Sequence, residues 1–129
     1  MKVVTAALIQ RSGEWLLARR GTGQHLEDFW EFPGGKLEDN ETLQECLERE
    51  ILEELNLVVK ASEIFTESIF SYENGKIKLV AIHALLVSGD LRLSVHDRVE
   101  WLKPTEMIKL RLAPADIPIA QNLMRIYGN

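Results

Sequence analysis

Apolar and polar positions alternate along several segments of the chain, which is the pattern of β-strands with one buried face. Two turn sequences interrupt this alternation, at residues 11–13 and at Glu73-Asn74-Gly75. The second is typical of a β-hairpin. A proline at position 104 ends the last alternating segment. The pattern therefore predicts strands at residues 2–10, 14–20, 63–72, 76–87 and 98–104.

A helical period replaces the alternation after residue 42. Thr42 is followed three positions later by Glu45, which is the sequence of a capping box and predicts where the helix begins. The apolar period continues to about Leu55, and Asn56 can adopt the left-handed conformation that ends a helix. We therefore expect a helix whose N-terminal cap is Thr42 and whose C-terminal cap is Asn56.

Two further helical segments are predicted near the end of the chain, a short turn at residues 104–110 and a helix within residues 113–128. Residues 21–36 are rich in glycine and form a long predicted loop, and loops of this length inside a compact domain tend to be functional. Strands precede helices in both halves of the chain. The expected fold class is α/β or α+β with a mixed sheet, in one domain over residues 1–129.

The composition limits the cellular compartments and the classes of binding partner that we expect. The 129 residues carry a net charge of −5, which argues against binding to a nucleic-acid polymer. The apolar segments are too short to span a membrane, and the first ten residues lack the features of a signal peptide. The one cysteine, Cys46, fits a reducing cytoplasm. An anionic protein of this kind can still bind a small phosphate compound when a metal ion bridges the two.

The predicted helix concentrates negative charge in one place. At the angular spacing of a helix, Glu50, Glu53 and Glu54 share an arc of about 100°. This arc borders the apolar stripe of the helix, and like charges at such spacing repel one another. A solvated charged face is one interpretation. The other is a site for Mg²⁺ or Mn²⁺, which prefer clustered oxygen ligands. The apolar stripe consists of Leu43, Leu47, Ile51 and Leu55.

The spacing of these residues resembles the Nudix box. The pattern begins at Gly35 and Glu41, continues through Arg49-Glu50-Ile51 and Glu53-Glu54, and ends at Asn56-Leu57. Its departure is Asn56, where the family usually has glycine, and asparagine tolerates the same left-handed conformation. The resemblance extends over nearly the whole chain and implies the Nudix α/β/α sandwich, a mixed β-sheet between helices.

The resemblance also implies roles for residues of the box. Glu50, Glu53 and Glu54, together with the backbone carbonyl of Gly34 in the Gly34-Gly35 turn, would ligate Mg²⁺ or Mn²⁺. Arg49 would orient the carboxylates, and Glu53 is the favoured base.

Two further positions concern the support of the site and a possible additional ligand. The resemblance implies a structural role for Glu41 at the helix start. Many relatives carry a further carboxylate at the position of Val95. Here either Asp97 substitutes for that carboxylate as a ligand or the ligand is absent.

Two other segments indicate the substrate. Residues 18–36 resemble MutT-type enzymes, which act on 8-oxo-dGTP, and the resemblance implies that Arg20, His25 and Phe32 bind the nucleotide. Residues 112–124 resemble bacterial CTP pyrophosphohydrolases, with Asp116 where MutT-type enzymes have an asparagine. A carboxylate accepts hydrogen bonds from an exocyclic amine such as that of cytosine. The structural alternatives are a solvated strand end for Arg20, core packing for Phe32 and a helix cap for Asp116.

The expected function is therefore Mg²⁺-dependent hydrolysis of (deoxy)nucleoside triphosphates to a monophosphate and pyrophosphate. The candidate substrates are CTP, dCTP and 8-oxo-dGTP, and the protein would act on free nucleotides as a monomer or a homodimer. Alternatives are a Nudix hydrolase of ADP-ribose or a dinucleoside polyphosphate, and a nucleotide-binding module without activity. The presence of all three box glutamates favours an enzyme.

Overall fold

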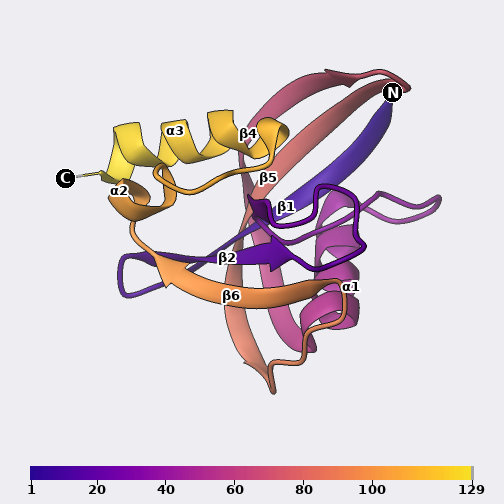
Figure 1. Cartoon of the computed structure of the whole chain (residues 1–129). Helices are drawn as coiled ribbons and strands as arrows, with labels where there is room; N and C mark the ends of the chain where they lie inside the picture. Colours follow the sequence, from indigo (N-terminus) through magenta and orange to yellow (C-terminus); the bar gives the residue numbers. More distant parts are fainter. Residues whose placement is uncertain (129) are drawn as a thin grey trace.

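A six-stranded mixed sheet forms the centre of the computed structural model, which describes residues 1–128 (Figure 1). Five of the strands lie in the order β3-β2-β1-β5-β4, and β6 pairs with β2. β1 runs parallel to β5, whereas the β4–β5 and β2–β6 pairs are antiparallel. The strands are β1 (Lys2–Arg11), β2 (Glu14–Arg20), β3 (Trp30–Glu31), β4 (Leu57–Tyr72), β5 (Gly75–Gly89) and β6 (His96–Leu102).

Helices cover both faces of the sheet, and each face has its own apolar core. α1 (Leu43–Leu55) packs through Leu47, Ile51 and Leu55 against side chains of β1, β4 and β5. α3 (Ile117–Tyr127) packs on the other face together with α2 (Pro104–Met107) and the short 3₁₀ helix η1 (Pro114–Asp116). The predicted arrangement of a mixed sheet between helices is confirmed.

The caps of α1 are those that the sequence predicts. The Thr42 hydroxyl accepts from the Glu45 N–H at 3.1 Å, and the Glu45 carboxylate accepts from the Thr42 N–H at 2.8 Å. Asn56 adopts a left-handed conformation, with φ at 57°, and its N–H donates to the Leu52 carbonyl. These local bonds fix both ends of the helix that carries the acidic residues.

Three strands differ from the prediction. β6 runs from His96 to Leu102 rather than over residues 98–104. The loop after β2 contains β3, a two-residue strand that pairs with Ala18 and Arg19 of β2. Strand β4 begins at Leu57, directly after the cap of α1, rather than at residue 63. Its first part pairs with the end of β5, with Leu57 opposite Gly89, and alternates buried and exposed residues because one of its faces packs against α1.

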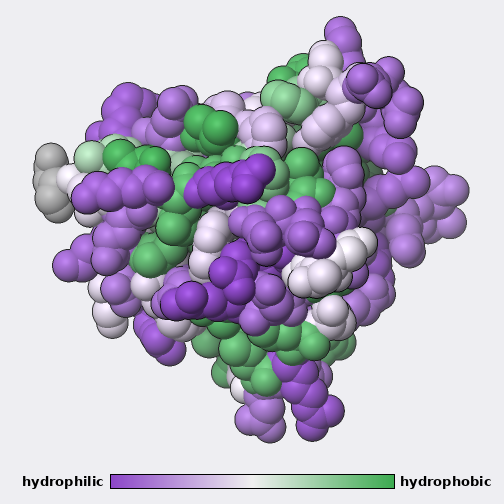
Figure 2. Space-filling model, in the orientation of Figure 1, coloured by the Kyte–Doolittle hydropathy of each residue, from purple (hydrophilic) through white to green (hydrophobic). Residues whose placement is uncertain are grey.

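The surface in the view of Figure 2 is mainly hydrophilic, with apolar areas between the polar ones. Exposed apolar side chains on the strands include Val58 of β4 and Leu85 and Val87 of β5. Among residues 1–128, no helix is both long enough and apolar enough to cross a membrane.

Candidate active site

Arg49 is the centre of a network of carboxylates on α1 and the preceding loop. Its Nη2 and Nε atoms donate to the two oxygens of Glu41 at 2.7 and 3.0 Å. Its Nη1 atom donates to Glu50 Oε1 at 2.8 Å and to Glu53 Oε1 at 3.2 Å. These hydrogen bonds raise the pKa of Arg49 and lower that of Glu41 to about 2. Arg49 therefore stays charged and fixes the orientation of Glu50 and Glu53.

Glu41 also ties the loop to the helix. Besides the two bonds from Arg49, its Oε1 accepts from the backbone N–H of Glu38 at 2.9 Å. A planar guanidinium and a carboxylate joined by two parallel bonds form a geometrically defined pair. Glu41 thus lies in the position expected of a residue that supports the site rather than one that meets a substrate.

The turn at Gly34 and Gly35 brings the backbone against the acidic helix. A Cβ atom at Gly35 would collide with the Glu50 carboxylate, and one at Gly34 would collide with the Thr5 carbonyl on β1. The Gly35 carbonyl accepts from the Thr5 N–H at 2.8 Å and from its hydroxyl at 3.1 Å. Within residues 1–128 the Gly34 carbonyl, which the resemblance assigns to a cation, accepts no loop or side-chain hydrogen bond.

Glu54 lies in an environment that disfavours an isolated negative charge. Burial, with the nearby carboxylates of Glu31 and Glu50, raises the pKa of Glu54 to about 8. Its Oε1 atom is buried and has no hydrogen-bond partner within the described chain. A buried, unpaired oxygen of this kind is costly unless a proton or a cation occupies it. The residues present therefore fit a divalent cation.

The three box glutamates are nevertheless not assembled into a finished metal cage. Glu53 is 56% exposed and turned towards Arg49, whereas Glu54 points into the protein. Within residues 1–128, no three His, Cys, Asp or Glu side chains have the arrangement of a complete metal site. A cation would have to draw Glu53 away from Arg49 to use all three carboxylates.

We expect the metal-free protein to lose stability as the pH rises from about 5 to 8. A folded-state pKa of about 8 lies above the ordinary 4.5, so Glu54 keeps its proton when folded and loses it when unfolded across this range. Mg²⁺ should restore the melting temperature at pH 8, and Glu54→Gln should reduce the slope against pH. Calorimetry from pH 5 to 8 checks this.

The slope should not vanish in Glu54→Gln, because the pKa of buried Asp116 is also raised and acts in the same direction. An identical slope in the parent and the variant would contradict the burial of an uncompensated Glu54 carboxylate.

A second network, centred on Glu31 of β3, borders the acidic helix. Glu31 Oε2 accepts from Arg20 Nη1 at 2.9 Å and lies 2.8 Å from Nε2 of His96, whose side chain is 0% exposed. Arg20 Nε also donates to the His25 carbonyl at 2.6 Å. Arg20, which the resemblance assigns to nucleotide binding, is thus already hydrogen-bonded within the protein in this conformation.

The sequence analysis did not identify Glu31 and His96 as residues of the candidate site. Nothing local identifies the pair, because they are 65 residues apart in the chain. The structure identifies Glu31 through β3, the two-residue strand that follows on from the long loop and pairs with β2. Burial, and after it the charge of Glu31, raises the pKa of both Glu54 and Asp116.

Asp116 lies at the start of α3, yet its side chain does not cap that helix. No capping hydrogen bond from Asp116 to α3 is present in the described chain. Its Oδ2 atom accepts from the Phe32 backbone N–H at 2.8 Å, and the residue is only 5% exposed. Burial and the charge of Glu31 raise the pKa of Asp116 well above its usual value, which favours the protonated form. The helix-cap alternative is therefore wrong.

The other residues with predicted roles in the site do not all lie where those roles require. The Phe32 side chain is 3% exposed and belongs to the core under α3, so in this conformation its ring does not form a pocket wall. His25 is exposed on the loop, with its ring centroid 6.4 Å from that of Tyr72. Asp97 pairs with Arg19 at 2.8 Å on the surface, which lowers its pKa. Asp97 thus lies in an ion pair rather than beside the box glutamates.

Comparison with known proteins decides the family. The model of the NUDIX domain matches residues 1–123. The chain belongs to the Nudix family. It is 35% identical over 123 residues to the CTP pyrophosphohydrolase of Escherichia coli K12, covering 95% of this chain and 91% of that protein. It is 39% identical over 59 residues to an 8-oxo-dGTP diphosphatase of Proteus vulgaris, covering 46% of this chain and 53% of that protein.

Solved Nudix structures share the fold. The solution structure of the E. coli ORF135 protein has a TM-score of 0.85 and 34% identity, covering 98% of this chain and 90% of that chain. A MutT protein from Methanosarcina mazei also has a TM-score of 0.85, at 25% identity, covering 96% of this chain and 93% of that one. The family and sandwich fold predicted from the sequence are confirmed. The chain is a Nudix hydrolase, an enzyme acting on phosphorus-containing anhydrides, and such hydrolases generally need a divalent metal.

Proposed function

We propose that this Nudix hydrolase cleaves (deoxy)nucleoside triphosphates to a nucleoside monophosphate and pyrophosphate, with CTP, dCTP and 8-oxo-dGTP as the candidate substrates. The observation that carries the proposal is the position of Glu31, whose charge acts both on Glu54 of the box and on buried Asp116. A group suited to a cation and a group suited to a base edge therefore border the same carboxylate. The names of the similar enzymes support the same substrate classes.

In this proposal Glu50, Glu53, Glu54 and the Gly34 carbonyl hold Mg²⁺ or Mn²⁺. The bound ion would polarise phosphorus and lower the pKa of a bound water. Arg49 holds Glu50 in place, since the two are 2.8 Å apart, while the exposed Glu53 takes the proton from the attacking water. The free-nucleotide substrate fits a cytoplasmic enzyme that removes unwanted nucleotides, acting as a monomer or a homodimer.

In this proposal Asp116 determines base choice through one of its oxygens, because the other is already hydrogen-bonded within the protein. The Phe32 N–H occupies Oδ2, which leaves Oδ1 for the base. In the ionised form Oδ1 accepts from an exocyclic amine such as cytosine N4, whereas in the protonated form Oδ1 carries the proton and donates to a base carbonyl or ring nitrogen.

Replacement of Asp116 by asparagine tests this proposal. The amide oxygen would take the Phe32 N–H, and the amide nitrogen, which cannot accept, would face the base. We expect Asp116→Asn to lower kcat/KM for CTP and dCTP by roughly 10- to 150-fold. The loss of the hydrogen bond between the cytosine amine and a charged acceptor accounts for a change of this size. Activity on 8-oxo-dGTP, which offers a carbonyl, should fall less. Steady-state kinetics with CTP, dCTP, dGTP and 8-oxo-dGTP measures the ratio.

The melting temperature of the Asp116→Asn variant serves as the control, because the bond to Phe32 is kept. A ratio of cytosine to purine activity that is the same in both proteins would remove Asp116 from base recognition. Absence of turnover with every triphosphate in the parent protein would instead overturn the proposed reaction.

A further inference from the structure

The loop that follows β5 is fastened to the C-terminal end of α1. The Arg92 N–H donates to the Leu55 carbonyl at 2.9 Å. The Asp90 carbonyl accepts from Nδ2 of Asn56, also at 2.9 Å. Residues 90–92 are therefore held in one conformation, so that little conformational entropy is lost when another molecule binds them.

Leu91, between these two anchored residues, lies beside an apolar pocket. Leu91 is 46% exposed and lines a pocket of about 260 Å³. An exposed leucine next to a hollow with apolar walls offers both halves of a contact with another copy of the same surface. The walls belong to the core beneath α1 and are Leu16, Leu57, Leu86, Val99 and Trp101, with the Arg11 guanidinium 4.1 Å from the centre of the Trp101 ring.

The surface around Leu91 is apolar as well. Leu93 of the same loop, Leu85 and Val87 of β5 and Val58 of β4 are exposed, and Val58 pairs with the last residues of β5. We call these four residues and Leu91 the foot surface, because Figure 1 places the end of β5 at the foot of the view, where Figure 2 shows hydrophobic surface. Exposed apolar side chains that gather in this way are typical of an interaction site.

The charges beside Leu91 indicate which partner fits. Asp90 and Arg92 flank Leu91 and are exposed. Neither of them takes part in an ion pair within residues 1–128. A two-fold axis perpendicular to the loop at Leu91 makes the loops of two copies antiparallel, so Asp90 of each copy faces Arg92 of the other. Such a contact buries Leu91 against its counterpart and brings opposite charges together twice.

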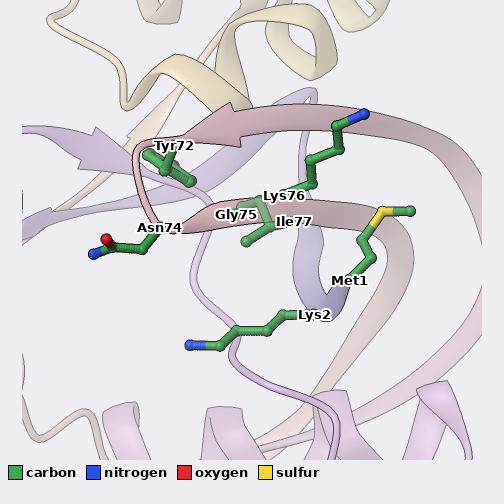
Figure 3. Close-up of a pocket in the computed structure, with 7 residues that line it drawn as sticks. All are labelled: Met1, Lys2, Tyr72, Asn74, Gly75, Lys76 and Ile77. Atoms are coloured by element: carbon green, nitrogen blue, oxygen red, sulfur yellow. The ribbon is translucent and has the colours of Figure 1, made fainter.

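The pocket at the other end of β5 lacks this self-complementarity. It has a volume of about 230 Å³ and lies at the hairpin, where Lys2 and Lys76 give it positive charge (Figure 3). Among the described residues no carboxylate lines it, so a two-fold contact there would bring like charges together. Of the two ends of β5, the foot surface is therefore the one that suits a second copy of this chain.

We propose that the foot surface is the interface of a homodimer, in which Leu91 of each copy packs at the mouth of the other copy's pocket. The proposal decides between the two oligomeric states that the proposed function leaves open. It does not depend on which substrate the enzyme hydrolyses.

The test compares Leu91→Arg with Ile69→Arg, a matched control, by sedimentation velocity from micromolar to millimolar concentration. Both variants place an arginine at an exposed apolar position, but Ile69, 61% exposed, lies near the hairpin end of β4. Leu91→Arg should raise the dissociation constant of the dimer by roughly 30- to 1,000-fold, because each substitution occurs twice in a two-fold interface. Ile69→Arg should leave that constant within about threefold of the parent value.

An exchange of charges tests the antiparallel pairing in variants that keep Leu91. Asp90→Arg or Arg92→Asp alone places like charges together and should weaken the dimer by roughly tenfold or more. The double variant Asp90→Arg/Arg92→Asp restores opposite charges across the axis. Its dissociation constant should return to within about threefold of the parent value.

A parent protein that stays monomeric at millimolar concentration overturns the proposal, and so does a dimer that Leu91→Arg leaves intact. A double charge variant that dimerises no better than the two single variants overturns it as well. Asp90 and Arg92 are exposed, so the charge variants decide the question even if Leu91→Arg fails to fold.

Discussion

Replacement of Glu53 by glutamine should lower kcat by roughly 10²- to 10⁴-fold, the range lost when a general base is removed. Glutamine keeps the shape of the side chain but cannot accept the proton of the attacking water or offer a charged ligand. The fold should persist, because Arg49 keeps its bonds to Glu41 and Glu50. Single-turnover kinetics with a saturating triphosphate measures the loss in the chemical step.

Glu48→Gln provides the matched control for Glu53→Gln. Glu48 lies on the same helix, but its carboxylate accepts from the Ala61 N–H at 2.9 Å, a bond that the glutamine oxygen can keep. We expect Glu48→Gln to retain normal turnover. Near-normal activity in a folded Glu53→Gln variant would show that the acidic face of α1 does not perform the chemistry.

Removal of divalent cations should abolish hydrolysis, and Mg²⁺ or Mn²⁺ should restore it. The physical reason is that the carboxylates of Glu31 and Glu50 lie near Glu54, whose buried Oε1 atom has no hydrogen-bond partner within the described residues. Without a cation, this site repels the phosphates instead of binding them. Activity should also rise towards alkaline pH, because the nucleophile must be deprotonated.

The measurement is turnover after exhaustive chelation, followed by titration with each metal. Isothermal titration of Mn²⁺ into the protein without substrate gives a second readout, and Glu54→Gln should weaken that binding. Undiminished hydrolysis in the chelated protein would exclude a metal-dependent reaction.

Local bonds explain why so much of α1 was predictable. Its capping box joins Thr42 to Glu45, and its cap at Asn56 bonds to Leu52, so both ends are defined within a few residues. The contact of Arg49 with Glu53 likewise spans one helical turn. Such contacts follow from helical geometry alone.

The base side of the site depends on contacts that helical or strand periods do not encode. Asp116 bonds to Phe32 across 84 residues, and His96 meets Glu31 across 65. A carboxylate between Pro114 and Pro118 has the sequence of a helix cap, and only the docking of η1 beside β3 turns it towards the Phe32 backbone. Phe32 and Tyr72 likewise differ in burial because of packing across the sheet, which the order of residues does not reveal.

The sheet separates the acidic helix from the turn that carries Asp116. α1 packs into the core on one face, whereas η1 borders the core on the other. We therefore expect substitutions at Asp116 to leave the packing beneath Arg49 and Glu50 undisturbed. Under the proposed function, a library confined to residues 113–117 would change the preferred nucleobase without rebuilding the phosphate chemistry.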